Sequence, residues 1–98
     1  MTKNAALDCA SSNIRVNCIC PGGTDTPIIT NWLKKLANPD KELNALLDQV
    51  PMRKLIQPNE VANLAIFLAS DEASALTGSI VAVDNGYLAG VLKKGHNF

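Results

Sequence analysis

The sequence predicts an α/β protein whose parallel sheet is incomplete within this chain. Two short apolar runs, residues 14–20 and 79–83, are predicted strands, and the segments between them have helical periodicity. A strand–helix–strand order implies parallel strands joined by a right-handed crossover. Two buried parallel strands would leave backbone edges and apolar faces exposed. We therefore expect two strands plus helices that need more sheet, from upstream residues or from partner chains.

Length and charge narrow the function classes. The 98 residues suit one small domain, and 47% of them are hydrophobic, which predicts a soluble globular chain. Nine basic and nine acidic residues cancel without a basic stripe, which argues against nucleic acid and anionic membranes as partners. Neither a membrane-spanning apolar run nor a signal segment is visible, so the expected compartment is the cytoplasm.

The three cysteines predict no disulfide framework and no metal site. Cys9, Cys18 and Cys20 are odd in number, and Cys18-Ile19-Cys20 lacks the C-x-x-C spacing of redox and zinc sites. In a strand, Cys18 and Cys20 would share one face, where we expect them to act as small buried hydrophobic residues.

The N-terminal third predicts a helix followed by a strand. Residues 1–10 are good helix formers, with Ala6, Leu7 and Ala10 able to share a face. This helix begins at residue 1 without room for a cap, as the end of a longer helix would. Residues 11–13 are a plausible stop. In the strand at 14–20, apolar residues occur at both odd and even positions, which predicts burial on both faces.

The segment Pro21-Gly22-Gly23 is expected to leave the sheet, because proline has no N–H to donate and glycine accepts unusual dihedrals. Asp25 or Thr26 can then cap a helix whose first residue is Pro27. Turn and cap chemistry explains each residue of this loop separately, so the residues alone do not require a ligand.

Three helical segments follow. In the first, Ile28, Ile29, Trp32, Leu33 and Leu36 recur at helical spacing, which predicts a core face. Residues 38–40 break this helix, and a second amphipathic segment ends at Pro51. Pro58 opens the third, which extends to residue 70 and carries the apolar stripe Val61, Leu64, Ala65, Leu68 and Ala69. A left-handed turn at residues 84–86 follows the second strand, and the tail, 91–98, is expected to be loose, with His96 solvated.

Several motifs in order resemble the short-chain dehydrogenase/reductase family, over nearly the whole chain up to Gly90. These are Asn13-Ile14-Arg15-Val16-Asn17, Pro21-Gly22 with Thr26, Gln57-Pro58-x-Glu60-Val61-Ala62, Phe67-Leu68-Ala69-Ser70, Ala73-Ser74, Thr77-Gly78, Val83-Asp84 and Gly86-Tyr87. Thr24 departs from the family's usual β-branched aliphatic residue, and Asn85 from its second glycine.

The resemblance implies a doubly wound, Rossmann-like parallel sheet that transfers a hydride between NAD or NADP and an alcohol or carbonyl substrate. Residues 1–90 would be the C-terminal segment of that domain, and 91–98 a tail. Carried over by position, Pro21 and Gly22 should contact the nicotinamide. Thr24 should offer backbone groups to its carboxamide, and Thr26 its hydroxyl.

The same resemblance gives residues 30–51 a second interpretation, as the mobile segment that covers the substrate. Ile28, Ile29, Trp32 and Leu33 then belong to a substrate lid, and the break at residues 38–40 suits a hinge. The family also implies a homo-oligomer, with the last strand and the Pro58 helix near a subunit interface.

The catalytic residues of the family are not in this chain. Its tyrosine acid/base needs a lysine four residues later, but the only tyrosine, Tyr87, is followed at that spacing by Val91. The glycine-rich dinucleotide loop is also absent. We therefore expect no catalytic residue and no metal site here, and no activity of the chain alone. The alternatives are a non-catalytic polypeptide that associates with itself or a full-length relative and, less favoured, a small nucleotide-binding module.

Overall fold

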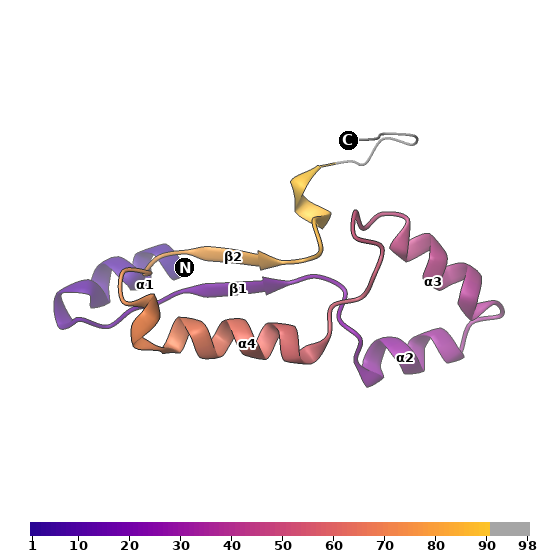
Figure 1. Ribbon diagram of the computed structural model, residues 1–98, viewed down its shortest axis with the longest axis horizontal. Coiled ribbons are helices and arrows are strands. Elements are labelled where there is room, and N and C mark those ends of the chain that lie inside the picture. The colour runs from indigo at the N-terminus through magenta and orange to yellow at the C-terminus, as the bar shows by residue number, and fades with distance from the viewer. Residues whose placement is uncertain (91–98) are drawn as a thin grey trace.

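Two parallel strands and four α-helices make up residues 1–90, the part of the chain that the computed structural model describes (Figure 1). β1 (Cys18–Pro21) pairs with β2 (Ile80–Val83) in parallel, from Cys18 opposite Ile80 to Pro21 opposite Val83. The α-helices are α1 (Thr2–Cys9), α2 (Pro27–Lys34), α3 (Pro39–Leu47) and α4 (Pro58–Ala69). Short 3-10 turns are η1 (Ala10–Ser12), η2 (Asp71–Ala73) and η3 (Tyr87–Ala89). The predicted α/β class and parallel pairing are confirmed.

The first strand begins later than predicted, at Cys18 and not at residue 14. Just before the strand, Val16 and Asn17 are held mainly by side-chain hydrogen bonds and not by a regular backbone ladder. The N–H of Val16 donates to the Thr77 hydroxyl at 3.1 Å, and its carbonyl accepts from Gly78 at 2.7 Å. Asn17 donates to the Leu76 carbonyl at 2.9 Å and accepts from the N–H of Ser79 at 3.1 Å. These residues are therefore extended and anchored without forming a strand.

Pro21 remains within β1, where the sequence predicted a departure from the sheet. The ladder does not need its missing N–H. Val83 is the register partner of Pro21, and the Val83 carbonyl accepts instead from the N–H of Gly22 at 2.9 Å. The backbone nitrogen of Pro21, which has no hydrogen to donate, thus points to the edge of β1 that does not pair with β2, where proline is tolerated.

Helix α1 has one buried residue. Ala6 is buried, whereas Leu7, predicted to share its face, is 77% exposed. Ala10 is also exposed. The predicted stop after residue 10 is confirmed, since Asn13 adopts a left-handed conformation (φ 58°) and its N–H donates to the Ala10 carbonyl.

Helix α4 begins and ends with well-defined bonds. Pro58 is its first residue, and the N–H of Gln57 donates to the Glu60 carboxylate at 2.9 Å. Beyond its C-terminus, the Arg15 guanidinium donates to the Ser70 carbonyl at 3.1 Å. Of the predicted apolar stripe, Leu68 is buried, Val61 and Leu64 are half-buried, and Ala65 and Ala69 are exposed.

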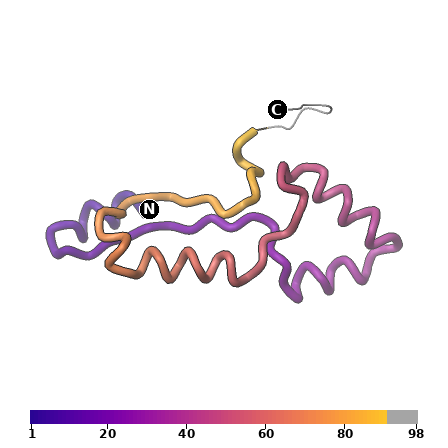
Figure 2. Tube along the Cα trace, viewed as in Figure 1, coloured from indigo at the N-terminus to yellow at the C-terminus, as the bar shows by residue number. Residues whose placement is uncertain are grey.

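Helices α2 and α3 lie beyond the end of the sheet, away from α1 and α4 (Figures 1 and 2). No residue of either helix is buried. Of the predicted core face of the first helix, Ile28 is 81% exposed and Trp32 is 47% exposed, whereas the other three residues, Ile29, Leu33 and Leu36, are half-buried. Within residues 1–90 that face is therefore only partly covered. Within residues 1–90, α2 and α3 pack mainly against each other.

The apolar core is small. Within residues 1–90 the buried hydrophobic residues are Ala6, Ile56, Leu68 and Ala73. The Cα radius of gyration is 17.1 Å, whereas a compact domain of this length has about 13 Å. The small number of buried residues and the large radius of gyration both fit a sheet that is incomplete within this chain. None of the helices in the described part has the length and hydropathy needed to cross a bilayer. The predicted tail, 91–98 with His96, lies outside the described residues.

Candidate functional site

The loop after β1 is hydrogen-bonded to the chain segment that precedes α4. Thr24 and Ile56 form an isolated parallel bridge. The N–H of Ile56 donates to the Gly23 carbonyl at 2.9 Å, and the Ile56 carbonyl accepts from the N–H of Asp25 at 2.8 Å. Ile56 is also the most deeply buried large side chain described, at 2% exposure. The bridge therefore fixes the loop to the core.

The same bridge orients Thr24. In a parallel bridge one residue uses both of its backbone groups, and its partner's groups point to the opposite side. Here Ile56 uses both, so the N–H and carbonyl of Thr24 face away from Ile56. A donor and an acceptor thus lie side by side on the outer edge of the loop.

The two threonine hydroxyls of the loop differ in their surroundings. Thr24 donates to the Gly22 carbonyl at 3.0 Å, which tightens the turn. Thr26 is the N-cap of α2, as the sequence allowed, but its side chain makes no capping hydrogen bond. Helix capping, the simplest structural role for Thr26, is therefore not the role of its hydroxyl.

Gly22 lets the loop approach the turn after β2. A Cβ at Gly22 would lie 3.0 Å from the Asp84 Cβ and 3.1 Å from its Cα. Asp84 is itself held in place, because its carboxylate accepts hydrogen bonds from the N–H groups of Gly86 and Leu88, each at 3.0 Å. A side chain at position 22 would have to displace that backbone.

The turn after β2 joins the segment that follows α3. Asn85 has φ 53°, which confirms the predicted left-handed turn. Its side-chain amide donates to the Lys54 carbonyl at 2.9 Å, and its own carbonyl accepts from the N–H of Met52 at 3.2 Å. Gly86, at φ 92°, packs against Pro51.

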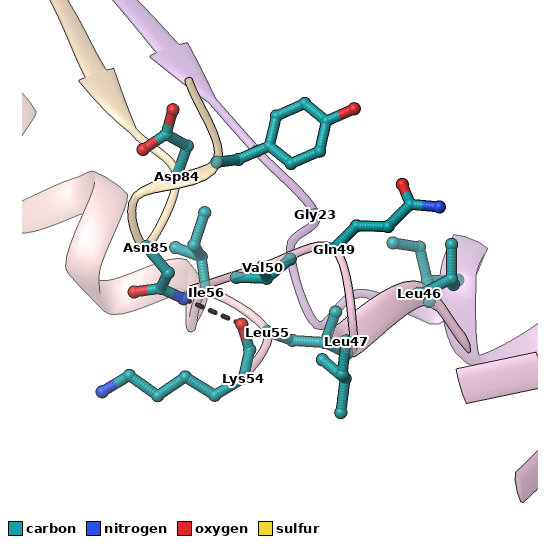
Figure 3. A pocket seen from close by; sticks show the side chains of 13 residues that line it. Gly23, Leu46, Leu47, Gln49, Val50, Lys54, Leu55, Ile56, Asp84 and Asn85 are labelled. Atoms are coloured by element: carbon teal, nitrogen blue, oxygen red, sulfur yellow. Dashed lines mark hydrogen bonds between the residues drawn. The ribbon is translucent and has the colours of Figure 1, made fainter. Parts of the chain in front are cut away.

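These segments enclose a cavity of about 260 Å³ at the end of the sheet (Figure 3). Leu46, Leu47, Val50 and Leu55 give it a mainly apolar lining. Asp84 and Asn85 from the turn after β2 supply polar groups. The remaining lining residues are Gly22, Gly23, Ile29, Gln49, Lys54, Ile56 and Tyr87.

The structure gathers only some of the predicted site residues around this cavity. Gly22 and Ile29 line it. Outside the cavity lining are Pro21 at the end of β1, Thr24 and Thr26 in the loop, and Ile28, Trp32 and Leu33 of α2. The predicted cofactor loop therefore has two sides, one toward the cavity and one toward the outer edge of Thr24.

The sequence analysis missed two positioning residues, Ile56 at the loop and Asn17 at the start of β1. Ile56 belongs to a two-residue apolar pair, Leu55-Ile56, which is too short to show a period. Asn17 lay inside a motif without an assigned role, although a polar residue amid a buried run is a signal of a structural hydrogen bond. The described residues include no group of three or more His, Cys, Asp or Glu side chains that could hold a metal ion.

Residues 1–88 match the family model described as Enoyl-(Acyl carrier protein) reductase. The chain belongs to the short-chain dehydrogenase/reductase family. It is 43% identical to the oxidoreductase UcpA of Escherichia coli K12 over 88 residues, which are 88% of this chain and 34% of UcpA. It is 44% identical to 2,5-dichloro-2,5-cyclohexadiene-1,4-diol dehydrogenase LinX of Sphingobium indicum over 91 residues, covering 93% of this chain and 34% of LinX.

The fold agrees with this membership. The crystal structure of YwfH, an NADPH-dependent reductase involved in bacilysin biosynthesis, superimposes with a TM-score of 0.81 at 33% identity, covering 92% of this chain and 36% of YwfH. The chain therefore has part of the predicted Rossmann-like α/β fold. It spans about a third of the length of the curated relatives that it matches.

Proposed function

We propose that residues 1–90 are the C-terminal segment of an NAD(P)-binding oxidoreductase domain and supply its nicotinamide-side loop. The observation that carries the proposal is the orientation of Thr24. Its N–H and carbonyl face away from the Ile56 bridge, and within residues 1–90 neither group has a backbone hydrogen-bond partner. A carboxamide has one carbonyl acceptor and an NH₂ donor, which is the complement of that pair.

The other loop residues support the same ligand. Gly22 brings the backbone close to the turn at Asp84, and Pro21 ends β1 at its carboxyl end, where ligands of open α/β sheets bind. The Thr26 hydroxyl is not used to cap α2 and can add a hydrogen bond to the carboxamide. When bound, the nicotinamide supplies the hydride chemistry, and this chain's part is to orient it.

Helices α2 and α3 are proposed as the substrate lid. Both lie beyond the sheet, and the exposed Ile28 and Trp32 offer apolar surface to a ligand or to the rest of a longer domain. Leu46 and Leu47, at the end of α3, line the apolar cavity, so a moving α3 would change its shape. The substrate class is a small-molecule alcohol or carbonyl compound, and LinX, by its name, oxidises such a diol.

A chimera of LinX tests this function. Replacing the matching segment of LinX with this chain should give an enzyme that still oxidises the LinX diol with a nicotinamide nucleotide, because the loop and lid are proposed to do the same work. A folded, oligomerised chimera without nucleotide binding would contradict the proposal. The separate 98-residue chain should show no NAD(P)H oxidation with carbonyl substrates, and turnover by it would contradict the assignment of the proton-transfer residues to another part of the protein.

A second candidate function is association without catalysis, with itself or with a full-length relative. It is favoured by the open edges of the sheet, since within residues 1–90 each strand has a single strand partner. Light scattering of the purified chain, alone and mixed with UcpA, distinguishes this role. A stable, stoichiometric complex that leaves activity unchanged would favour it over the cofactor-loop function.

A further inference from the structure

Asn85 is hydrogen-bonded, through its side chain and through its backbone, to the segment that follows α3. Its amide donates to the Lys54 carbonyl at 2.9 Å, the contact drawn as a dashed line in Figure 3, and its carbonyl accepts from the N–H of Met52 at 3.2 Å. Gly86 lies close beside them, since a Cβ there would be 3.1 Å from the Cβ and Cγ of Pro51. We call this set of three contacts the Asn85 clamp.

The residue between the two clamped positions has an unfavourable backbone conformation. Arg53 is left-handed (φ 51°), which is costly for residues other than glycine, asparagine and aspartate. Such conformations persist only where the surrounding contacts fix them. Asn85 bonds to Met52 on one side of Arg53 and to Lys54 on the other. The N–H of Arg53 also donates to the Val50 carbonyl at 2.8 Å. The clamp therefore holds a strained turn at the end of the α2–α3 segment.

The side chain of Asn85 adds a bond that its own turn does not require. A glycine, the family's usual residue at this position, adopts the left-handed backbone freely but has no amide to donate. Every partner in the clamp belongs to residues 1–90, and its two hydrogen bonds are to backbone groups. The clamp therefore does not depend on which surfaces a longer domain would cover.

The clamp limits where the α2–α3 segment can move. Before α2, the backbone of Gly23 and Asp25 is bonded to Ile56. After α3, the chain is bonded to Asn85. The segment therefore starts from β1 at one end and is tied to the turn after β2 at the other.

We propose that Asn85 is a positioning residue that fixes the C-terminal end of the substrate lid. The inference rests on the proposed lid function of α2 and α3. Without the amide bond, the end of α3 would adopt more positions, and fewer molecules would hold the lid where it covers the substrate. The apparent substrate affinity falls with that fraction. The nucleotide loop is tied separately, by Ile56, so the nucleotide affinity should not change.

Site-resolved hydrogen exchange of the 98-residue chain tests the clamp itself. Asn85→Gly keeps the left-handed turn and removes the amide. The N–H of Met52 should then exchange about fivefold faster, as expected for one lost hydrogen bond, while the N–H of Ile56 keeps its rate. Asn13→Gly is the matched control, because Asn13 is also left-handed (φ 58°) and uses its backbone N–H to end the turn after α1. This control should change neither rate. An unchanged Met52 rate in Asn85→Gly would overturn the proposal.

Steady-state kinetics of the LinX chimera test the positioning role. Asn85→Gly should raise the KM for the LinX diol about fivefold and leave the nucleotide KM as it was. A purely structural role would lower the amount of active enzyme without this selective change. Asn85→Asp is the second variant, since aspartate tolerates the left-handed backbone but its carboxylate cannot donate to the Lys54 carbonyl. It should raise the diol KM at least as much.

The outcomes separate this inference from the proposed function. An unchanged diol KM in both variants, or an equal rise of the diol and nucleotide KM values, would overturn the role of Asn85 and leave the nicotinamide loop standing. A chimera that binds no nucleotide before any substitution would contradict the proposed function, and with it the lid that Asn85 positions.

Discussion

Thr24 and Ile56 are paired in a parallel bridge in which Ile56 supplies both backbone hydrogen bonds. This one contact ties the loop after β1 to the segment before α4 and turns the N–H and carbonyl of Thr24 outward. Ile56 is only 2% exposed, so the orientation of the loop rests on a core residue. The predictions below follow from this arrangement, with stability and nucleotide binding measured in the LinX chimera.

Ile56→Ala should lower the free energy of unfolding by about 2–5 kcal/mol, as expected for a buried isoleucine truncated to alanine. Hydrogen exchange at the amides of Asp25 and Ile56 should speed up, because both bonds of the bridge depend on the buried side chain. Lys41→Ala is the control. Lys41 is exposed on α3, and its truncation should change the unfolding free energy by less than about 0.5 kcal/mol.

Gly22→Ala should destabilise the chimera and weaken nucleotide binding together. The new Cβ would lie 3.0 Å from the Asp84 Cβ and 3.1 Å from its Cα, and relieving such overpacking costs about 1–3 kcal/mol. Gly23→Ala is the matched control, since its nearest neighbour is the flexible end of Leu55 at 3.5 Å. Equal effects of the two substitutions in thermal unfolding would contradict the role given to Gly22.

Asn17→Ala should lower the free energy of unfolding by about 1–3 kcal/mol, because it removes the hydrogen bonds to the Leu76 carbonyl and the Ser79 N–H. The Ser79 N–H loses its side-chain partner, whereas the Leu76 carbonyl keeps the Arg15 guanidinium at 3.3 Å. Asn63→Ala, at an exposed position of α4, should be nearly neutral. Asn17→Asp keeps the acceptor for Ser79. Its protonated carboxyl also has an O–H donor for the Leu76 carbonyl, so this variant should be closest to the wild type at acid pH and less stable at neutral pH, where the carboxylate has no donor. Urea unfolding measures all three.

The sequence was informative wherever local patterns decide structure. The Pro58 helix, the parallel pairing and the left-handed Asn85 all follow from caps, periods and backbone preferences. The sequence was uninformative where a single long-range contact determines whether a residue joins a strand or is buried. Val16 has an apolar, strand-like sequence, but the Thr77 hydroxyl takes its N–H and keeps it out of the ladder. Trp32 has helical spacing but nothing within residues 1–90 buries it, since periodicity marks a face without showing what covers it.

The candidate site divides in the same way. The loop after β1 was predicted from its prolines, glycines and threonines. The contact that orients it comes from Ile56, more than thirty residues away along the chain. Such a contact cannot be read from a short apolar pair, because it depends on the path of the chain through α2 and α3.

Alkylation of Cys20 should show the raised pKa of its thiol. In a Cys9→Ser background, the rate of iodoacetamide modification of Cys20 should rise only at a pH above that of an ordinary cysteine, since the thiolate is the reacting species. Cys18→Ala removes the first cause of the shift and should lower the pKa, so that Cys20 reacts faster at neutral pH. An unchanged pH profile in that variant would show that Cys18 does not control the Cys20 thiol.

Nucleotide binding by a Thr26→Val variant of the LinX chimera tests the central claim most directly. Valine keeps the shape of threonine and removes the hydroxyl, which does not cap α2, so the helix should remain stable. Thr30→Val is the control, because the Thr30 hydroxyl bonds within the helix, to the Thr26 carbonyl at 3.0 Å. We expect Thr26→Val to raise the nucleotide KM by about fivefold or more, equivalent to one lost hydrogen bond of about 1 kcal/mol, with Thr30→Val unchanged. An unaltered nucleotide KM and kcat in Thr26→Val would contradict the assignment of this loop to the nicotinamide.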